Sequence, residues 1–166
     1  MAAVGVCVAV LVYAVFFWPS EQDRIREVVL RLADAVEVKG DAQNPAIRAL
    51  HLQGELAEVL SKEATAIIPE LSEPLRGRKE ITALAAGAGT AWATARVSFS
   101  TMKIEIDRSR EHASVTATAT LTATEHGGRP RRDTRDTSFD LEKIDGRWWI
   151  TMIEVTPRSQ PEGLPQ

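Results

Sequence analysis

The polar and apolar positions along the chain change their period near residue 96. Before it, apolar residues recur at the three- and four-residue spacing of amphipathic helices, and after it they alternate with polar residues as in half-buried strands. Helices are expected over 20–38, 44–61 and 78–92, with a short strand at 64–68. Four longer strands are expected over 96–107, 112–125, 131–144 and 147–156. The pattern therefore predicts an α+β domain with a four-stranded antiparallel meander.

Short motifs mark the ends of these elements. Ser20 and Asp23 form a capping box at the start of the first helix. Asp145-Gly146 is a strong hairpin signal between the last two strands. Gly87 and Gly89 weaken the third helix, so they indicate close packing of another element; no strand precedes them, which argues against a phosphate loop. The apolar positions of the second helix, which carry it to about residue 61, are Ile47, Leu50, Leu56, Val59 and Leu60.

The first eighteen residues have no charged side chain, and Val4 to Trp18 is almost entirely apolar. As a helix they would span about 27 Å, close to the hydrocarbon core of a bilayer. A buried helix would need a larger protein to cover it, and a cleaved signal peptide would need basic residues before the run. We expect a transmembrane anchor over 1–19. Arginines after the span favour a cytoplasmic domain, but single anchors on small domains often hold them outside, and we expect the extracytoplasmic side.

Length and composition limit the remaining choices. The 166 residues are sufficient for one domain, expected over 20–156 with a disordered, proline-containing tail at 157–166. The net charge of −3 provides no basic surface for nucleic acid, so no nucleic-acid partner is expected. Cys7 is the single cysteine and the three histidines are scattered, so neither a disulfide, a metal site nor a cofactor is expected.

Three segments together resemble a known family. They are the end of the first helix, Ala35 to Asp41, the loop into the third helix, Leu75 to Ile81, and the final hairpin, Asp145 to Ile150. In this order and spacing the chain resembles the nuclear transport factor 2-like superfamily, also called SnoaL-like or cystatin-like α+β cone proteins. The resemblance implies three helices packed in a strongly curved antiparallel sheet, with an apolar cavity open at one end. It implies no single activity, because this fold supports enzymes, transport factors and assembly domains.

The last strand is expected to carry the cavity face. The family's Gly-x-Trp pattern implies that Trp148 faces inward, and alternation would then place Glu154 on the same side, where a raised pKa would suit an acid or base. Glu154 and His51 are the catalytic candidates; the alternatives are a Glu reaching water or an Arg, and a structural His. The expected pocket-lining residues are Trp92, Leu121, Phe139, Trp148, Ile150 and Met152.

Other catalytic sets are incomplete. Asp133 and Arg135 share a strand face, as the epoxide hydrolases of this fold would require, but Asp136 lies on the other face, and a solvated charged hairpin explains all three. Tyr13, the single tyrosine, falls in the apolar N-terminal segment, so the enolate-binding hydroxyl of steroid-isomerase-like enzymes is not available to the cone.

The opposite face of the last strand points to association. Trp149, Ile153 and Val155 would form an apolar patch on the outer sheet face, which predicts a homodimer or a protein partner. The sequence therefore predicts a membrane-anchored, non-catalytic domain that binds a protein partner or a small apolar ligand. The alternative is a SnoaL-like isomerase, lyase or hydrolase acting on a small hydrophobic substrate.

Overall fold

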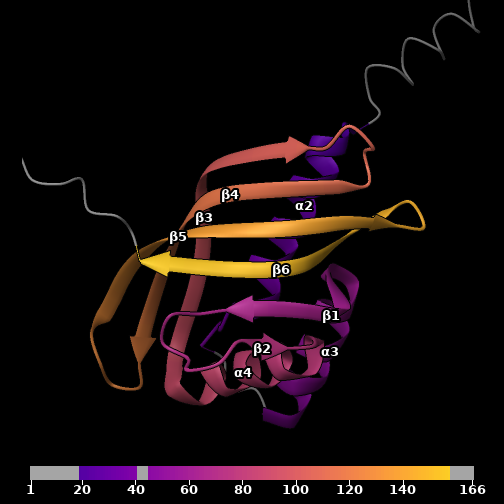
Figure 1. The fold of residues 1–166 in the computed structure, drawn as a ribbon. Coiled ribbons are helices and arrows are strands. Elements are labelled where there is room, and N and C mark those ends of the chain that lie inside the picture. The colour runs from indigo at the N-terminus through magenta and orange to yellow at the C-terminus, as the bar shows by residue number, and fades with distance from the viewer. Residues whose placement is uncertain (1–18, 41–44, 158–166) are drawn as a thin grey trace, which may run out of the picture.

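Three helices lie against one face of a curved six-stranded sheet (Figure 1). The computed structural model describes residues 19–40 and 45–157. The helices are α2 (Glu21–Val36), α3 (Pro45–Val59) and α4 (Arg78–Ala91). The strands are β1 (Leu60–Ile67), β2 (Leu75–Arg76), β3 (Trp92–Ile106), β4 (His112–Glu125), β5 (Pro130–Ile144) and β6 (Arg147–Pro157). The predicted α+β architecture and the predicted meander are confirmed.

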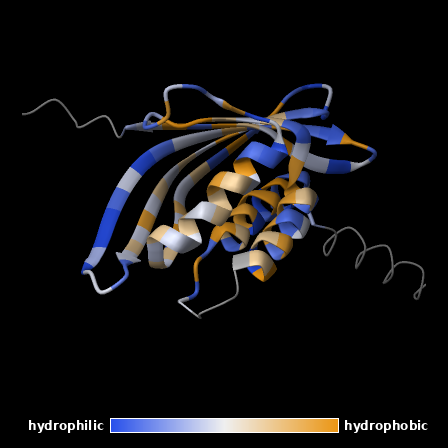
Figure 2. Cartoon of the chain, turned by 90° about the horizontal axis from the view of Figure 1, so that it is seen from below, coloured by the Kyte–Doolittle hydropathy of each residue, from blue (hydrophilic) through white to orange (hydrophobic). Residues whose placement is uncertain are grey.

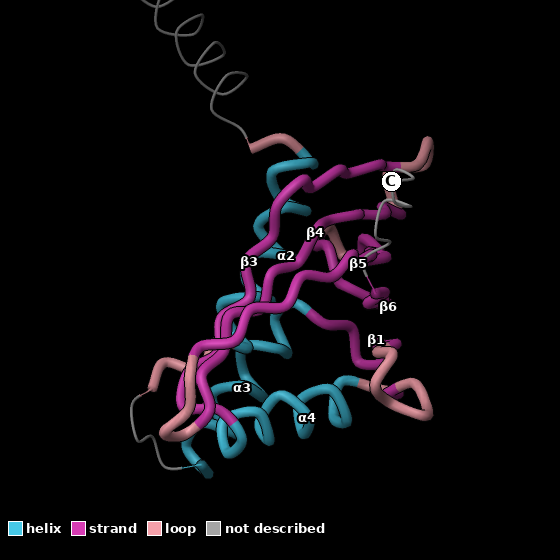
Figure 3. Tube along the Cα trace, turned by 90° about the vertical axis from the view of Figure 1, so that its left-hand side faces the viewer, coloured by secondary structure: helices cyan, strands magenta, loops and turns pink. Residues whose placement is uncertain are grey.

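The sheet order is β2-β1-β6-β5-β4-β3. From β3 to β6 each strand pairs antiparallel with the next, whereas β1 pairs parallel with β6 and antiparallel with the two-residue β2. The long strands bend so that their far ends run down beside the helices (Figure 3). The two-residue β2 lies where only a loop was expected, and β1 begins four residues before the predicted strand, directly after α3.

The predicted transmembrane helix lies in residues 1–18, outside the described residues. Across 19–40 and 45–157, none of the helices has the length and apolar character needed to cross a membrane. The fold class that included a membrane span is therefore corrected to three helices and a six-stranded sheet. The tail at 158–166 also lies outside the described residues.

The main apolar core fills the space between the helices and the concave face of the sheet. Figure 2 shows the helices on one side of the sheet. Alternation along β4 explains which residues the sheet contributes to the core. The alanines and Val115 of β4 face inward, while its threonines face outward. The largest fully buried side chains are Phe139, Ile25, Leu52, Leu56, Leu60, Leu141, Ile150, Val29, Val59 and Val115.

The apolar residues of α3 are not all buried. Ile47 and Leu50 are 52% and 70% exposed, whereas Leu52, Leu56 and Val59 are buried. Leu52, Leu56 and Val59 all belong to the main core, so they define the face of α3 that packs on the sheet.

A β-bulge changes the alternation along β6. Leu141 pairs with Ile150 and Asp140 pairs with Met152, so Thr151 is an extra residue on β6. The Thr151 hydroxyl donates to the Asp140 carbonyl at 3.1 Å. Because side chains alternate with a period of two, this one residue moves every later side chain of β6 to the other face.

The bulge overturns four predicted orientations. Ile153 packs against the main core, and Val155 pairs with buried Thr137 on that same face, so neither belongs to the outer patch. Met152 and Glu154 lie on the outer face instead. The expected inward direction of Glu154 is therefore wrong, for a reason that strict alternation cannot reveal.

Candidate functional site

A cavity of about 520 Å³ lies at the end of the fold where α2 ends, α3 begins and α4 meets β3. Its wall is made by residues of all three helices, the segment after α2, the start of β3 and the turn after β4. They are Asp34, Ala35, Glu37, Val38, Lys39, Gly40, Arg48, His51, Leu52, Glu55, Gly89, Trp92, Ala93 and His126. The volume suits a small organic molecule.

Arg48 is the unusual residue of this cavity. It lies one helical turn before Leu52, on the buried side of α3. Its Nη1 donates to the Glu37 carbonyl at 3.1 Å. Its Nε and Nη2 are buried and have no hydrogen-bond partner. A buried donor without an acceptor is unfavourable, so this guanidinium is only partly satisfied by the protein.

Gly89 makes room for the Arg48 head group. A Cβ built on Gly89 would lie 2.7 Å from Nε of Arg48, a distance that a real side chain would not tolerate, whereas a Cβ on Gly87 would meet nothing within 4 Å. The close packing expected at these glycines is therefore confirmed at Gly89 and wrong at Gly87.

The other charges around the cavity are paired or exposed. The Glu37 carboxylate, 14% exposed, accepts from Nε of Arg96 at 2.6 Å. Asp34 and Glu55 are exposed to water. The Lys39 ammonium, on a side chain that is 68% exposed, lies 4.0 Å from Glu37. Glu37 and Arg96 neutralise one another, and the remaining acidic and basic residues of the wall balance in number.

Two of the three histidines meet at this cavity. His51 from α3 and His126 from the turn after β4 both line it, and both are exposed. Glu154 does not line it. The two catalytic candidates of the sequence, Glu154 and His51, are therefore not brought together. His51 keeps Glu55 as its acidic neighbour one turn along α3, because both face the same cavity.

The predicted pocket-lining residues divide into three groups. Phe139, Trp148 and Ile150 are buried in the main core, where they fill space rather than line a cavity. Trp92 lines the cavity, and it packs with Leu121 against a smaller cluster of Val38, Ala95 and Ala123. Met152 lies on the outer face of the sheet, as described above.

Trp149 is the member of the predicted interface that stays on the outer face. It is half-buried, pairs with Glu142 of β5, and has the Arg147 guanidinium 4.9 Å from its ring centroid. A single chain does not test association, so the homodimer or protein partner through the outer sheet face stays a prediction.

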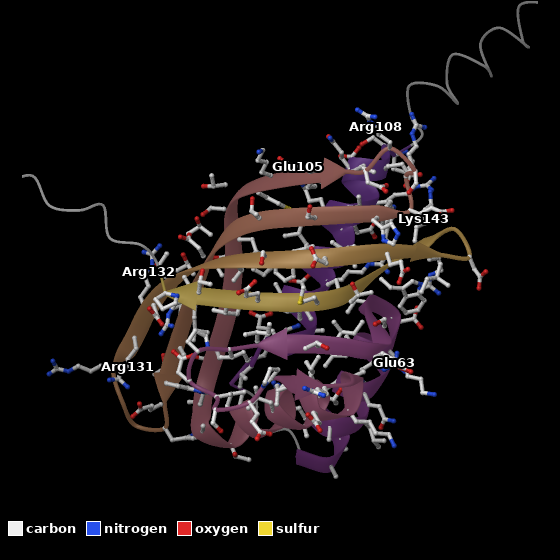
Figure 4. All side chains as sticks on the ribbon, in the orientation of Figure 1. Glu63, Glu105, Arg108, Arg131, Arg132 and Lys143 are labelled. Atoms are coloured by element: carbon white, nitrogen blue, oxygen red, sulfur yellow. The ribbon has the colours of Figure 1, made fainter. Side chains whose placement is uncertain are left out.

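The charged residues at the start of β5 form ion pairs with one another and with Glu70, which follows β1. Arg135 bonds Asp133 at 2.8 Å and Glu70 at 2.7 Å, and these acids raise the pKa of the guanidinium. Asp136 lies on the other face, where it accepts from the Thr118 hydroxyl. Figure 4 shows Arg131 and Arg132 pointing away from the molecule at this end. The expectation of a solvated charged hairpin agrees with this arrangement.

A different charged cluster holds the start of α2 to the sheet. Glu21 accepts from the Trp148 indole at 2.7 Å and from the Lys143 ammonium at 3.0 Å. Figure 4 labels Lys143 at this end of β5. The hydrogen bond from Trp148, followed by the bond and the charge of Lys143, lowers the pKa of Glu21. Next to it the predicted capping box is confirmed, since Ser20 and Asp23 exchange both hydrogen bonds.

Within the described ranges, no group of three or more His, Cys, Asp or Glu side chains is arranged to hold a metal ion. A second hollow, of about 510 Å³, lies on the sheet and the turn between β3 and β4, and most of its charged residues are acidic, among them Glu105, Asp140 and Glu142. It receives no side chain from a helix. The cavity beside Arg48 is therefore the better candidate for a ligand site.

The fold agrees with the comparisons. The family model of the SnoaL-like domain matches residues 48–154, so the chain belongs to the SnoaL-like domain family. This confirms the resemblance inferred from the sequence. A comparison with curated proteins gives no match.

Solved structures share the fold at low identity. An NTF2-like superfamily protein from Salmonella enterica is 18% identical, with 84% of this chain and 94% of that chain covered and a TM-score of 0.65. An NTF2-like protein with a cystatin-like fold from Novosphingobium aromaticivorans is 14% identical, with 81% and 80% covered and a TM-score of 0.61. Another protein from that organism, provisionally assigned as an aromatic ring hydroxylase, is 12% identical, with 82% and 88% covered and a TM-score of 0.65.

Proposed function

We propose that this SnoaL-like domain binds a small organic molecule in the cavity at the end of α2, without converting it chemically. The observation that carries the proposal is the contrast between this cavity and the core beside it. The core is filled by apolar side chains, and the cavity is the place where helices, sheet and polar groups converge around open space. Convergent polar groups beside an apolar wall are typical of ligand sites.

The position of the titratable groups favours binding over catalysis. His51, Asp34, Glu55 and His126 lie at the exposed rim of the cavity. A general acid or base gains its altered pKa mainly from burial or from a charged neighbour in a protected place. Among the residues that the structure describes, Thr137 is the one polar residue that is buried as a whole. This arrangement supports holding a ligand more than it supports proton transfer.

The experiment is ligand identification from the purified full chain. Native mass spectrometry of the protein under gentle ionisation would detect a co-purified small molecule, and extraction with organic solvent would identify it. We expect a molecule of a few hundred daltons that is released when the protein unfolds and that competes with added ligands for the cavity. A chain that binds no member of a broad panel of small apolar and amphipathic molecules would contradict the proposal.

An enzyme of the isomerase, lyase or hydrolase kind is the second candidate. It is favoured by one observation: His51 and Glu55 face the same cavity, so a base and an acid can reach one bound molecule. Prolonged incubation of the identified ligand with the chain separates the two candidates. Recovery of the unchanged compound supports binding. A product that forms with wild type and not with His51→Gln supports catalysis.

A further inference from the structure

The guanidinium of Arg48 presents one unused edge. Nε and Nη2 lie on the same side of the planar group, and both N–H bonds point in nearly parallel directions. The opposite nitrogen, Nη1, is already bonded to the Glu37 carbonyl at 3.1 Å. The pair without partners is thus the pair that binds the two oxygens of one carboxylate side by side.

Among residues 19–40 and 45–157, no acidic side chain accepts a hydrogen bond from that edge. Arg48 bonds the backbone carbonyl of Glu37, but the Glu37 carboxylate accepts from Nε of Arg96 at 2.6 Å. Asp34 and Glu55 line the cavity but are exposed, and neither accepts from Arg48. None of the described acidic side chains therefore satisfies Nε and Nη2.

We infer that the cavity binds the carboxylate of a small, partly apolar organic acid, and that Nε and Nη2 of Arg48 anchor it; this rests on the proposed function. The apolar remainder of the ligand lies against Trp92, Leu52 and Val38, which share the cavity wall with Arg48. The charge of the carboxylate is matched by Arg48, while the acids of the rim face water, where their field is screened.

Binding requires a small movement of the side chain. Nε and Nη2 are covered in the present conformation, and the head group rests over Gly89. Arginine has several rotatable bonds, so the guanidinium can leave the glycine surface and enter the cavity while α3 and α4 stay in place. The ligand exchanges an unsatisfied contact with a glycine for two charge-assisted hydrogen bonds.

Benzoate and benzamide are the probes, because they have nearly the same shape and differ in charge. Binding to the full chain is measured by isothermal titration calorimetry and by saturation-transfer NMR. We expect benzoate to bind at least about ten-fold more tightly than benzamide, as a charged bidentate pair is worth more than a neutral contact. Naphthoate and cyclohexanecarboxylate, each with its amide, extend the comparison to larger and non-aromatic acids.

Three variants locate the effect. Arg48→Met is expected to lower benzoate affinity at least about ten-fold and to leave benzamide unchanged, and Arg48→Lys to retain part of the preference because a single ammonium keeps the charge without the fork. Arg31→Met removes an exposed arginine from a different helix, α2, and controls for net charge. Circular dichroism verifies that each variant is folded, and Arg48→Lys keeps the test valid if Arg48→Met is not.

The outcomes separate the two proposals. If wild type binds acids and amides equally, or if both Arg48 variants bind benzoate like wild type, the carboxylate inference is wrong while the binding function stands. If no acid and no amide of the series binds, the carboxylate inference is wrong, and the binding function is wrong as well if no member of the broad panel binds.

Discussion

The two ends of α2 hold charged side chains in opposite situations. At the start, the Glu21 carboxylate is fully engaged by Trp148 and Lys143, which belong to the β5–β6 hairpin. At the end, the Arg48 guanidinium bonds one carbonyl of the segment after α2 and leaves two buried nitrogens without partners. The comparison suggests that the first end serves the stability of the fold, and that the second has polar capacity left for a ligand.

The largest difference between the ends is expected at their tryptophans. Trp148 is 4% exposed and belongs to the main core, whereas Trp92 is half-buried at the cavity. Trp148→Ala should lower the free energy of unfolding by about 3–5 kcal/mol, as large core truncations do. Trp92→Ala should cost clearly less, about 1–2 kcal/mol, because less of its surface leaves water. Urea unfolding followed by circular dichroism measures both, and equal losses would remove the contrast.

The next effect concerns the engaged carboxylate. Glu21→Gln removes the negative charge of the carboxylate to which the Lys143 ammonium and the Trp148 indole donate hydrogen bonds. It should lower the free energy of unfolding by about 1–2 kcal/mol. Glu27→Gln is the matched control on the same helix, since its ion pair with Arg31 is 59% exposed on both sides. The control should change stability by less than about 0.5 kcal/mol. If Glu27→Gln lost as much unfolding free energy as Glu21→Gln, the loss would come from removing a negative charge and not from the bonds to Trp148 and Lys143.

The same carboxylate predicts a pH dependence. Its pKa in the folded chain lies below the ordinary value of 4.5, so between the two values the folded state binds fewer protons than the unfolded state. The stability that Glu21 contributes is present above about pH 4.5 and is lost as pH falls through its lowered folded value. The difference in unfolding free energy between wild type and Glu21→Gln should therefore shrink in acid. A difference that stays constant from pH 7 to pH 3 would contradict this assignment.

The smallest effect on stability is expected at Gly87 and Gly89 of α4, beside the Arg48 head group at the cavity. Gly87→Ala meets open space and should raise stability by about 0.5–1 kcal/mol, because alanine favours the helix. Gly89→Ala gains the same helix preference but must displace the Arg48 head group. It should therefore be less stable than Gly87→Ala in thermal unfolding. Equal stabilisation by both would mean that Arg48 does not rest on Gly89.

Much of the fold follows from periodicity. The three helices, the meander and the capping box at Ser20 were predictable because each depends on residues close in sequence. The parallel pairing of β1 with β6 was not, since it joins segments about ninety residues apart and leaves no local pattern. The bulge at Thr151 was hidden because β6 is apolar on both faces, so either alternation of Ile150 to Val155 is plausible.

The candidate site was less predictable than the fold. Trp92 and His51 were expected in functional positions and do line the cavity, but Glu154 was placed on the wrong face by the bulge. Arg48 was not singled out at all. Its signal was available: it stands four residues before Leu52, on the face of α3 that proves to be buried. An arginine in that position is noticeable only once the true face is known.

The central claim, that one end of α2 stabilises the fold and the other is held for a ligand, is tested most directly by the unfolding free energy of ligand-free Arg48→Met. The account predicts a value within about 0.5 kcal/mol of wild type or above it, because an apolar side chain replaces a guanidinium whose donors are largely unmet. A loss as large as that of Glu21→Gln would contradict it, since Arg48 would then be part of what holds the fold together.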